Sequence, residues 1–222
     1  MSIKEVSLGI NEQSTTYGPI AYGSQAGTPC VELVVSSSDE RQKPVQSIES
    51  RFDNWSWKRK MRTGFARLRF SGRGVVNGEF DGGISDLCRL LDAALVDFEI
   101  KPTDIESRPS RTIQNLAANY SVFVPRDNDF DENALQFFAD QSQKHGNVDF
   151  LFKTEKTTDE EWVKDIVDEY RIYDSDVWLY PKGTIRRTVA ERQEFAIDIA
   201  KRNTWNVSPR LDITGIQSED DE

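Results

Sequence analysis

The last third of the chain, residues 148–213, constrains the fold more than any other stretch, because short apolar segments alternate there with longer amphipathic ones. Segments of strand length are expected at Val148–Lys153, Asp176–Tyr180 and Val207–Ile213. A helix is expected to open at the capping box Thr158-x-x-Glu161, and Thr184 is expected to cap a second helix that runs to Asn203. Strands and helices that alternate in this way predict a parallel sheet with right-handed crossovers.

The same alternation extends upstream of residue 148. Further strands are expected at Cys30–Val35, Phe65–Phe70, Val96–Ile100 and Tyr120–Val124, and helices at Ile84–Leu95, within Pro109–Asn119 and before Gly146. Asp129 or Asp131 is expected to cap the last of these helices, and Gly146 is expected to end it. The pattern predicts an α/β protein.

The composition favours a globular protein with one core. With 222 residues, of which 37% are hydrophobic and 30% charged, the chain suits a single domain over residues 1–217 and an acidic tail at 218–222. The formal net charge of −10 argues against nucleic acid as a partner, because proteins that bind phosphate backbones are usually basic.

The N-terminal residues and the two cysteines predict the compartment. Residues 1–10 lack the apolar core of a signal peptide, and no apolar run approaches the ~20 residues that a membrane helix needs. We therefore expect a cytoplasmic protein with no membrane partner. Cys30 and Cys88 are expected to be reduced thiols in the core.

Several motifs of the chain resemble those of one enzyme family. They are Ala26-Gly27-Thr28-Pro29, the run Val177–Thr184, the pair Glu191-Arg192 and the run Asn206–Ile213. These motifs resemble the 7-carboxy-7-deazaguanine synthases, which belong to the radical S-adenosylmethionine enzymes. The resemblance implies an α/β fold with a partial (βα)6-type barrel, as in compact radical S-adenosylmethionine enzymes. It also implies self-association, because members of the family form homodimers.

The positions at which that family holds its cofactors and substrate are changed in this chain. The family's C-x-x-x-C-x-x-C loop supplies three thiolates to a [4Fe–4S] cluster, and the matching positions here are Ser38, Gln42 and Val45. Only Gly72 remains of a Thr-Gly-Gly-Glu-Pro motif, and Ile20–Gly23 replaces a Gln-Gly-Glu-Gly substrate loop. We therefore expect no cofactor, no metal site and no catalysis, so the chain is predicted to be a pseudoenzyme.

The first functional hypothesis is a scaffold that acts through protein–protein interaction, with a partner protein or a second copy of the chain. A structural subunit of a larger assembly, such as a viral one, fits this hypothesis. The interaction surface is expected at Ser38, Arg41, Gln42, Trp55 and Trp57. Tryptophan is enriched at binding hot spots. Two other interpretations of the tryptophans stay open: they stack on bases beside the cations Lys58–Lys60, or they pack one face of a strand or hairpin.

The second functional hypothesis is a small-molecule binder, or an enzyme without iron, that uses the mouth of the barrel. Its ligand would be a 7-deazaguanine or another anionic molecule, bound at the carboxyl ends of the strands. Arg73, Lys101, Arg126 and Lys182 follow expected strands and are the candidates for this pocket. The alternative is that these four residues are solvated loop charges.

Overall fold

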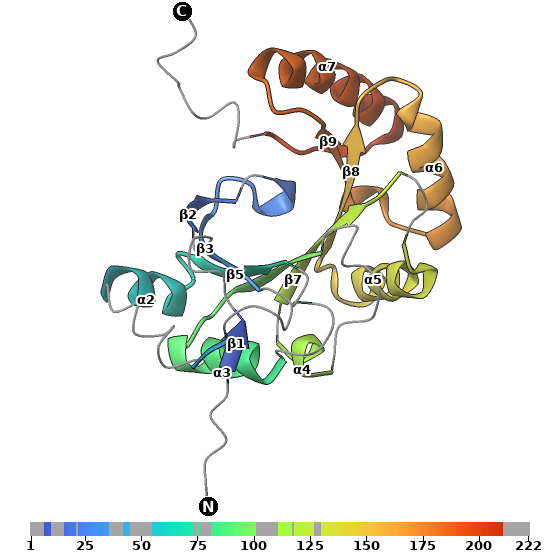
Figure 1. Cartoon of the computed structure of the whole chain (residues 1–222). Helices are drawn as coiled ribbons and strands as arrows, with labels where there is room; N and C mark the ends of the chain where they lie inside the picture. The colour runs from blue at the N-terminus through green and yellow to red at the C-terminus, as the bar shows by residue number, and fades with distance from the viewer. Residues whose placement is uncertain are drawn as a thin grey trace, which may run out of the picture. The chain divides into compact units, whose positions relative to one another are not determined.

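The computed structural model describes residues 7–9, 16–20, 22–35, 42–44, 55–72, 75, 81–100, 111–116, 118–126 and 130–210. The strands are β1 (Ser7–Gly9), β2 (Thr16–Pro19), β3 (Pro29–Val34), β4 (Gln42–Pro44), β5 (Arg67–Ser71), β6 (Val96–Ile100), β7 (Ala118–Val124), β8 (Val148–Thr154), β9 (Val177–Pro181) and β10 (Asn206–Val207). The helices are α2 (Trp55–Arg62), α3 (Asp81–Leu91), α4 (Arg111–Gln114), α5 (Glu132–His145), α6 (Asp159–Tyr170) and α7 (Arg186–Asn203), with short 3-10 turns η2 (Gly23–Gln25) and η6 (Asp174–Asp176) (Figure 1).

The fold is α/β, as predicted. Eight strands follow the order β10-β9-β8-β7-β6-β5-β3-β2 in one open sheet, and β1 pairs with β4 in a separate antiparallel ladder. The pairs β3–β5, β5–β6, β8–β9 and β9–β10 are parallel. Parallel strands require crossovers, which the helices α3, α6 and α7 supply in the described part of the chain.

The chain divides into two compact units. Unit 1 comprises Met1–Gly18, Thr28–Tyr120 and Phe130–Ala134, and unit 2 comprises Pro19–Gly27, Ser121–Asp129 and Leu135–Glu222.

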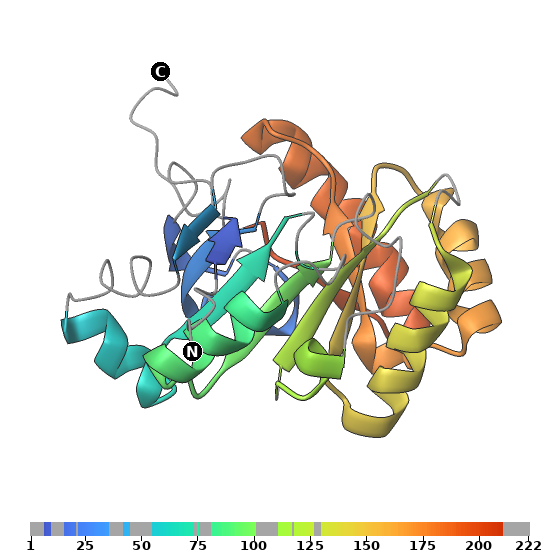
Figure 2. The same ribbon diagram turned by 60° about the horizontal axis from the view of Figure 1, so that its bottom comes forward.

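The apolar core of unit 1 lies on one face of its parallel strands. Phe70, Phe98 and Tyr120, from β5, β6 and β7, form a stacked row in which successive ring centroids are 5.6 and 5.8 Å apart. Helix α3 runs alongside these strands (Figure 2) and buries Ile84, Leu87, Cys88 and Leu91. Burial of such side chains contributes roughly 1.5–3 kcal/mol each to folding.

The core of unit 2 is built between β8, β9 and the helices that follow them. Helix α6 buries Val163, Ile166, Val167 and Tyr170, which recur at helical spacing, and its Trp162 ring lies 5.5 Å from the ring of Phe152 on β8. Helix α7 buries Val189, Ala196, Ile199 and Ala200.

Two predicted helix ends are confirmed in the structure. Asp131 Oδ1 accepts hydrogen bonds from the backbone N–H groups of Asn133, at 2.8 Å, and Ala134, at 3.4 Å, at the start of α5. Gly146 ends α5 in the left-handed region at φ +61°, and its N–H donates to Ser142 O at 2.7 Å.

Two predicted caps are wrong. Thr158 has helical torsion angles, φ −69° and ψ −6°, and makes no side-chain cap, because Asp159 Oδ2 instead accepts from the N–H groups of Glu155 and Lys156 at 2.6 and 3.1 Å. Helix α7 begins after Ile185, not Thr184, and has no side-chain cap. Thr158 thus keeps the N-cap position of α6 without capping it through its side chain, whereas in α7 the N-cap position falls to Ile185.

Two predicted strands have different bounds in the structure. The strand predicted at Phe65–Phe70 begins at Arg67, and Phe65 is an exposed loop residue. The strand predicted at Val207–Ile213 is Asn206–Val207, and residues 211–213 lie outside the described part of the chain.

Among the described helices, none has the length and apolarity that crossing a bilayer requires.

Candidate functional site

The feature of unit 1 that stands apart is a row of charged side chains on one face of its strands, opposite the Phe70–Phe98–Tyr120 row. Side chains alternate between the two faces of a strand, and here the second face carries polar residues. We call Glu32, Arg67, Arg69, Ser71, Asp97 and Glu99 the charged face. All except Glu32, which is half-buried, are buried.

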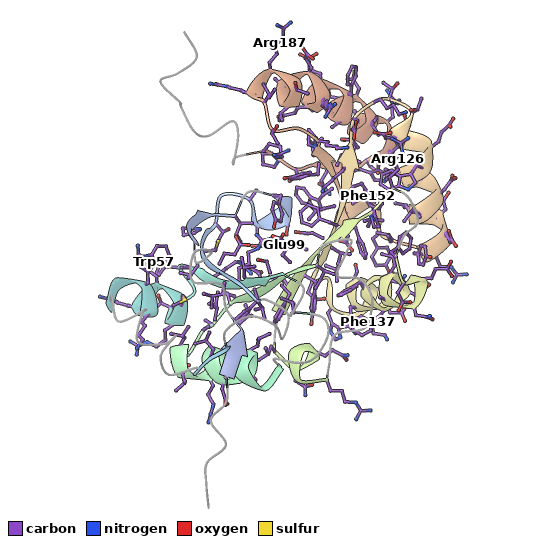
Figure 3. All side chains as sticks on the ribbon, viewed as in Figure 1. Trp57, Glu99, Arg126, Phe137, Phe152 and Arg187 are labelled. Carbon is purple, nitrogen blue, oxygen red and sulfur yellow. The ribbon has the colours of Figure 1, made fainter. Side chains whose placement is uncertain are left out.

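The charged face is held together by hydrogen bonds between neighbouring strands. Arg67 Nη1 donates to Asp97 Oδ1 and Arg69 Nη2 donates to Glu99 Oε2, each at 2.8 Å. Ser71 Oγ donates to Glu32 Oε1 at 2.7 Å. Figure 3 labels Glu99 on β6.

The strand register explains why the two ion pairs are diagonal. Arg69 lies directly opposite Glu32 on one side and Asp97 on the other. Its guanidinium nevertheless bonds to Glu99, which is two residues further toward the carboxyl end of β6. Arg67 reaches Asp97 with the same offset. Each arginine therefore leans toward the carboxyl ends of the strands.

Burial changes the proton affinity of groups on and beside this face. Removal of water raises the pKa of the Asp97 carboxyl, and Arg67 and Arg69 oppose that shift. Removal of water also raises the pKa of the neighbouring Cys30 thiol to about 11, although the positive charge of Arg69 lowers it. Cys30 is therefore a neutral thiol at pH 7 and not a nucleophilic thiolate.

Among the buried atoms of the charged face, Arg67 Nε and Asp97 Oδ2 make no hydrogen bond within the described residues. Buried polar atoms in proteins are generally hydrogen-bonded, and those that are not call for an explanation. The charged face also carries one more carboxylate than guanidinium: Glu32, Asp97 and Glu99 against Arg67 and Arg69.

Gly72 lets the chain pass close to β3 just after the charged face. Its φ of +94° favours glycine, and a Cβ atom there would lie 2.5 Å from Val35 O. The adjoining Val35 N–H donates to Ser71 O at 2.6 Å. Gly72, the one residue that matches the family's cofactor motif, thus has a structural role in this chain.

The corresponding feature of unit 2 is aromatic. Tyr22, Phe123 and Leu151 form a buried cluster, and Trp178 and Tyr180 pack against it. We call these five residues the aromatic cluster. The rings of Tyr22, Phe123 and Tyr180 meet edge to face, with centroids 4.9, 5.5 and 5.8 Å apart.

Two cations lie against the aromatic cluster. The Arg210 guanidinium is 4.5 Å from the Tyr180 centroid, and its Nη1 donates to Pro181 O at 2.7 Å. Lys153 Nζ lies 5.7 Å from the Phe123 centroid. Both contacts fall within the range of cation–π attraction.

The segment around η2 places Tyr22 in this cluster. Gly23 N–H donates to Ser208 Oγ at 2.9 Å, and Ser24 N–H and Oγ donate to Asp149 Oδ2 at 2.8 and 2.7 Å. Ile20–Gly23, which replaces the family's substrate loop, therefore packs Tyr22 into the core of unit 2.

The four predicted pocket cations have different outcomes. Arg73 and Lys101 lie outside the described residues. Arg126 forms an ion pair with the buried Asp159 at 2.5 Å. Lys182 pairs with Glu155, and the hydrogen bond from Lys182 is the main cause that lowers the pKa of the Glu155 carboxyl. These two cations each have a carboxylate partner in unit 2.

The five predicted interaction residues are spread over several segments. Ser38 and Arg41 lie outside the described residues, as does the proposed cluster position Val45, and Gln42 begins β4. Trp55 and Trp57 belong to helix α2, so their expected place on a strand or hairpin is wrong. The two-residue spacing of the tryptophans favours a strand. Trp57 and the fully buried Met61, however, are four residues apart, which is the spacing of neighbours on one face of a helix. Figure 3 labels Trp57, whose ring lies 4.9 Å from Lys60 Nζ.

The residues of this chain do not fit a cysteine-ligated [4Fe–4S] cluster. Its two cysteines, Cys30 on β3 and Cys88 on α3, are both buried, and burial raises their pKa values to about 11 and about 12. Cluster ligation needs thiolates at three neighbouring positions. In the part of the chain that the structure describes, no group of three His, Cys, Asp or Glu side chains is placed to hold a metal ion.

Neither the charged face nor the aromatic cluster was predicted from the sequence. The strand sequences Arg67-Leu68-Arg69-Phe70-Ser71 and Val96-Asp97-Phe98-Glu99-Ile100 do alternate between polar and apolar residues. This alternation could have indicated a charged second face. No such signal joins Tyr22, Phe123 and Tyr180, which are far apart in the sequence.

No family model matches this chain, and no curated protein matches it. Among solved structures, E. coli guanine deaminase is similar over 72% of this chain, with 8% sequence identity and a TM-score of 0.33. This chain spans 50% of the deaminase chain.

The comparison corrects one prediction. Guanine deaminase is an enzyme, so the prediction that this chain is a pseudoenzyme is contradicted, and we withdraw it.

Proposed function

We propose that this protein binds a small molecule rich in hydrogen-bond donors, such as a 7-deazaguanine, at the charged face of unit 1, and that it does so without an iron–sulfur cluster. The observation that supports this proposal is the set of buried charges on β3, β5 and β6. Membership of the resembled family and a cytoplasmic location remain predictions.

The cost of the charged face supports a functional role. Removing ions from water costs several kcal/mol per ion, and well-packed apolar residues in place of a buried ion pair are often neutral or stabilising. The other face of the same strands shows that apolar packing is available, since Leu68, Phe70 and Phe98 are fully buried there. Buried, perturbed ionisable groups cluster at functional sites in proteins.

Glu32 is the residue that a ligand can reach, because it is half-buried while its neighbours are buried. A carboxylate has two oxygens with about four acceptor positions, and Ser71 Oγ bonds to Oε1. The adjoining ring N–H and amino group of a 2-aminopyrimidinone match a carboxylate in a bidentate manner. The excess carboxylate on this face favours such a donor edge over an anion.

Isothermal titration calorimetry with 7-deazaguanine, and with benzoate as a planar anion, tests the proposal. We expect 7-deazaguanine to bind and benzoate not to bind. Glu32→Gln keeps an oxygen for Ser71 but presents an amide, so binding should fall at least tenfold. Glu194→Gln, an exposed position on α7, is the matched control and should bind as the wild type does. Equal affinity of Glu32→Gln and wild type would overturn the assignment.

A further inference from the structure

A second candidate site lies between helices α2 and α3 of unit 1, where Lys58, Arg59, Arg62, Leu90, Leu91 and Asp92 line a pocket of about 120 Å³. We call it the helix-pair pocket. Leu91 is buried and Leu90 is 41% exposed, so apolar surface is accessible between charged side chains. The pocket is independent of the charged face, which lies on the strands.

The two helices are joined firmly at this pocket. Met61 of α2 is fully buried, and its carbonyl oxygen accepts a hydrogen bond from the Ala94 N–H, just after α3, at 3.2 Å. Gly64 follows α2 with φ +75°, and its N–H also donates to Met61 O at 3.2 Å. These contacts fix the C-terminal end of α2 against the segment that follows α3, beside the pocket.

The rim of the helix-pair pocket is strongly basic in a chain of net charge −10. Lys58, Arg59, Lys60 and Arg62 follow one another on α2. Arg59 and Arg62 form no ion pair with any residue that the structure describes, and Lys60 contacts the Trp57 ring. On α3, Asp86 is already paired with Arg89 at 2.9 Å, which leaves Asp92 as the acid in the pocket lining.

The chemistry that fits this surface is an apolar side chain followed by several carboxylates. The chain itself carries such a segment: two residues separate Ile216 from Glu219-Asp220-Asp221-Glu222. An isoleucine suits the leucine-lined pocket, and the acids are opposite in charge to Arg59 and Arg62, which line it.

We infer that the C-terminal segment 213–222 of a second copy of this chain docks in the helix-pair pocket, with Ile216 in the pocket and the acids against α2. Exchange of the same segment in both directions gives a closed two-fold dimer. Each exposed ion pair is weak, but two docked segments in one dimer act together, because the second contact forms within an existing complex.

Sedimentation equilibrium of the full chain tests this inference. We expect a dimer whose dissociation constant rises at least tenfold in Arg59→Glu/Arg62→Glu and at least tenfold in Asp220→Lys/Asp221→Lys. The variant that combines all four changes should recover dimerisation, because the charges are complementary again. Dimerisation should also weaken with added salt.

Two further measurements keep the inference falsifiable. A fluorescein-labelled peptide of residues 211–222 should bind the wild-type protein in an anisotropy titration, and Leu90→Ser, at an exposed position, should reduce that binding. Arg186→Glu/Arg187→Glu, on the exposed start of α7, is the matched control and should leave dimer and peptide binding unchanged. A wild-type chain that stays monomeric, a peptide that does not bind, or a combined variant without recovery would overturn the inference.

Discussion

Unit 1 and unit 2 build one face of their strands from opposite kinds of side chain. In unit 1 this face holds the two buried ion pairs Arg67–Asp97 and Arg69–Glu99. In unit 2 it holds the aromatic cluster, in which Phe123 touches two tyrosine rings. Cations are present in both units, but in unit 2 Lys153 and Arg210 lie over aromatic rings.

The aromatic cluster and the charged face contribute differently to the stability of the protein. An aromatic cluster contributes free energy by burial and by ring contacts of about 0.5–1.5 kcal/mol each. A buried charged network contributes little net stability and becomes costly when one partner is lost. The stability that burial provides thus accounts for the aromatic cluster. It does not account for the buried charges of the charged face, for which we propose that a ligand is the reason.

The largest expected effect comes from breaking one ion pair of the charged face. Arg69→Met should lower the free energy of unfolding by roughly 3–5 kcal/mol, because it leaves the Glu99 carboxylate buried without its arginine. Urea denaturation followed by circular dichroism measures the change.

The double variant Arg69→Met/Glu99→Leu is the control for that experiment. It should recover most of the loss, because neither charge of the pair is then left buried without its partner. A single variant as stable as the wild type would show that the pair is not needed to hold this face together.

The next effect is expected in the aromatic cluster. Phe123→Leu keeps an apolar side chain but removes the edge-to-face contacts with Tyr22 and Tyr180, so it should cost about 1–3 kcal/mol. Thermal unfolding and urea titration both report the loss. Leu151→Met, a volume-conserving change in the same cluster, should cost under about 1.5 kcal/mol. If the two variants cost the same, the ring contacts do not contribute beyond burial.

A third effect is a loss of stability at high pH that originates in unit 1. Burial raises the pKa of Cys30 to about 11 and those of Cys88 and Tyr120 to about 12, from ordinary values of 9.0 for the thiols and 10.0 for the tyrosine. A group whose pKa is higher in the folded state than in the unfolded state stabilises the protein at pH values below the unfolded-state pKa. This contribution to stability is lost as the pH rises through the folded-state pKa. Stability should therefore fall progressively between pH 9 and pH 12.

The double variant Cys30→Ala/Cys88→Ala tests whether the thiols cause this fall in stability at high pH. This variant is less stable at pH 7 because it leaves cavities, but its stability should fall less steeply above pH 9. In the wild type, both thiols should react with Ellman's reagent slowly until the protein unfolds, because both are buried. Fast reaction of either thiol at pH 8 would contradict the burial on which the prediction depends.

The smallest effect is expected at an exposed charge cluster of unit 2. The hydrogen bond from Arg202, with others from Asn203 and Lys164, lowers the pKa of Glu160 to about 2. Glu160→Gln should therefore cost under about 1 kcal/mol at pH 7, since exposed ion pairs are weak. The cost should vanish as the pH falls from about 4.5 to 2, where the wild-type carboxylate takes up a proton. A cost that persists at pH 2 would point to packing and not to charge.

The order of these effects sharpens the contrast between the units. Replacement of both members of a buried pair should be tolerated on the charged face, whereas removal of one ring should not be tolerated without cost in the aromatic cluster. A charged face that accepts apolar residues and then loses 7-deazaguanine binding would show directly that its charges serve a ligand.

The sequence by itself determined what depends on neighbours along the chain. The alternation of strands and helices, the Asp131 cap and the Gly146 helix end follow from local patterns, because hydrogen bonds over a few residues decide them. Local patterns failed at Thr158, whose side chain makes no cap, and at Trp55 and Trp57, which belong to a helix.

The tertiary structure decided what depends on register and on distant contacts. Arg69 bonds to Glu99 only because β5 and β6 pair with Arg69 opposite Asp97, and no local rule gives that register. Tyr22, Phe123 and Tyr180 meet because separate segments pack together in unit 2. Side-chain burial is a property of the packed chain. The sequence therefore does not show that Arg69 is half of a buried ion pair, which it is in the fold.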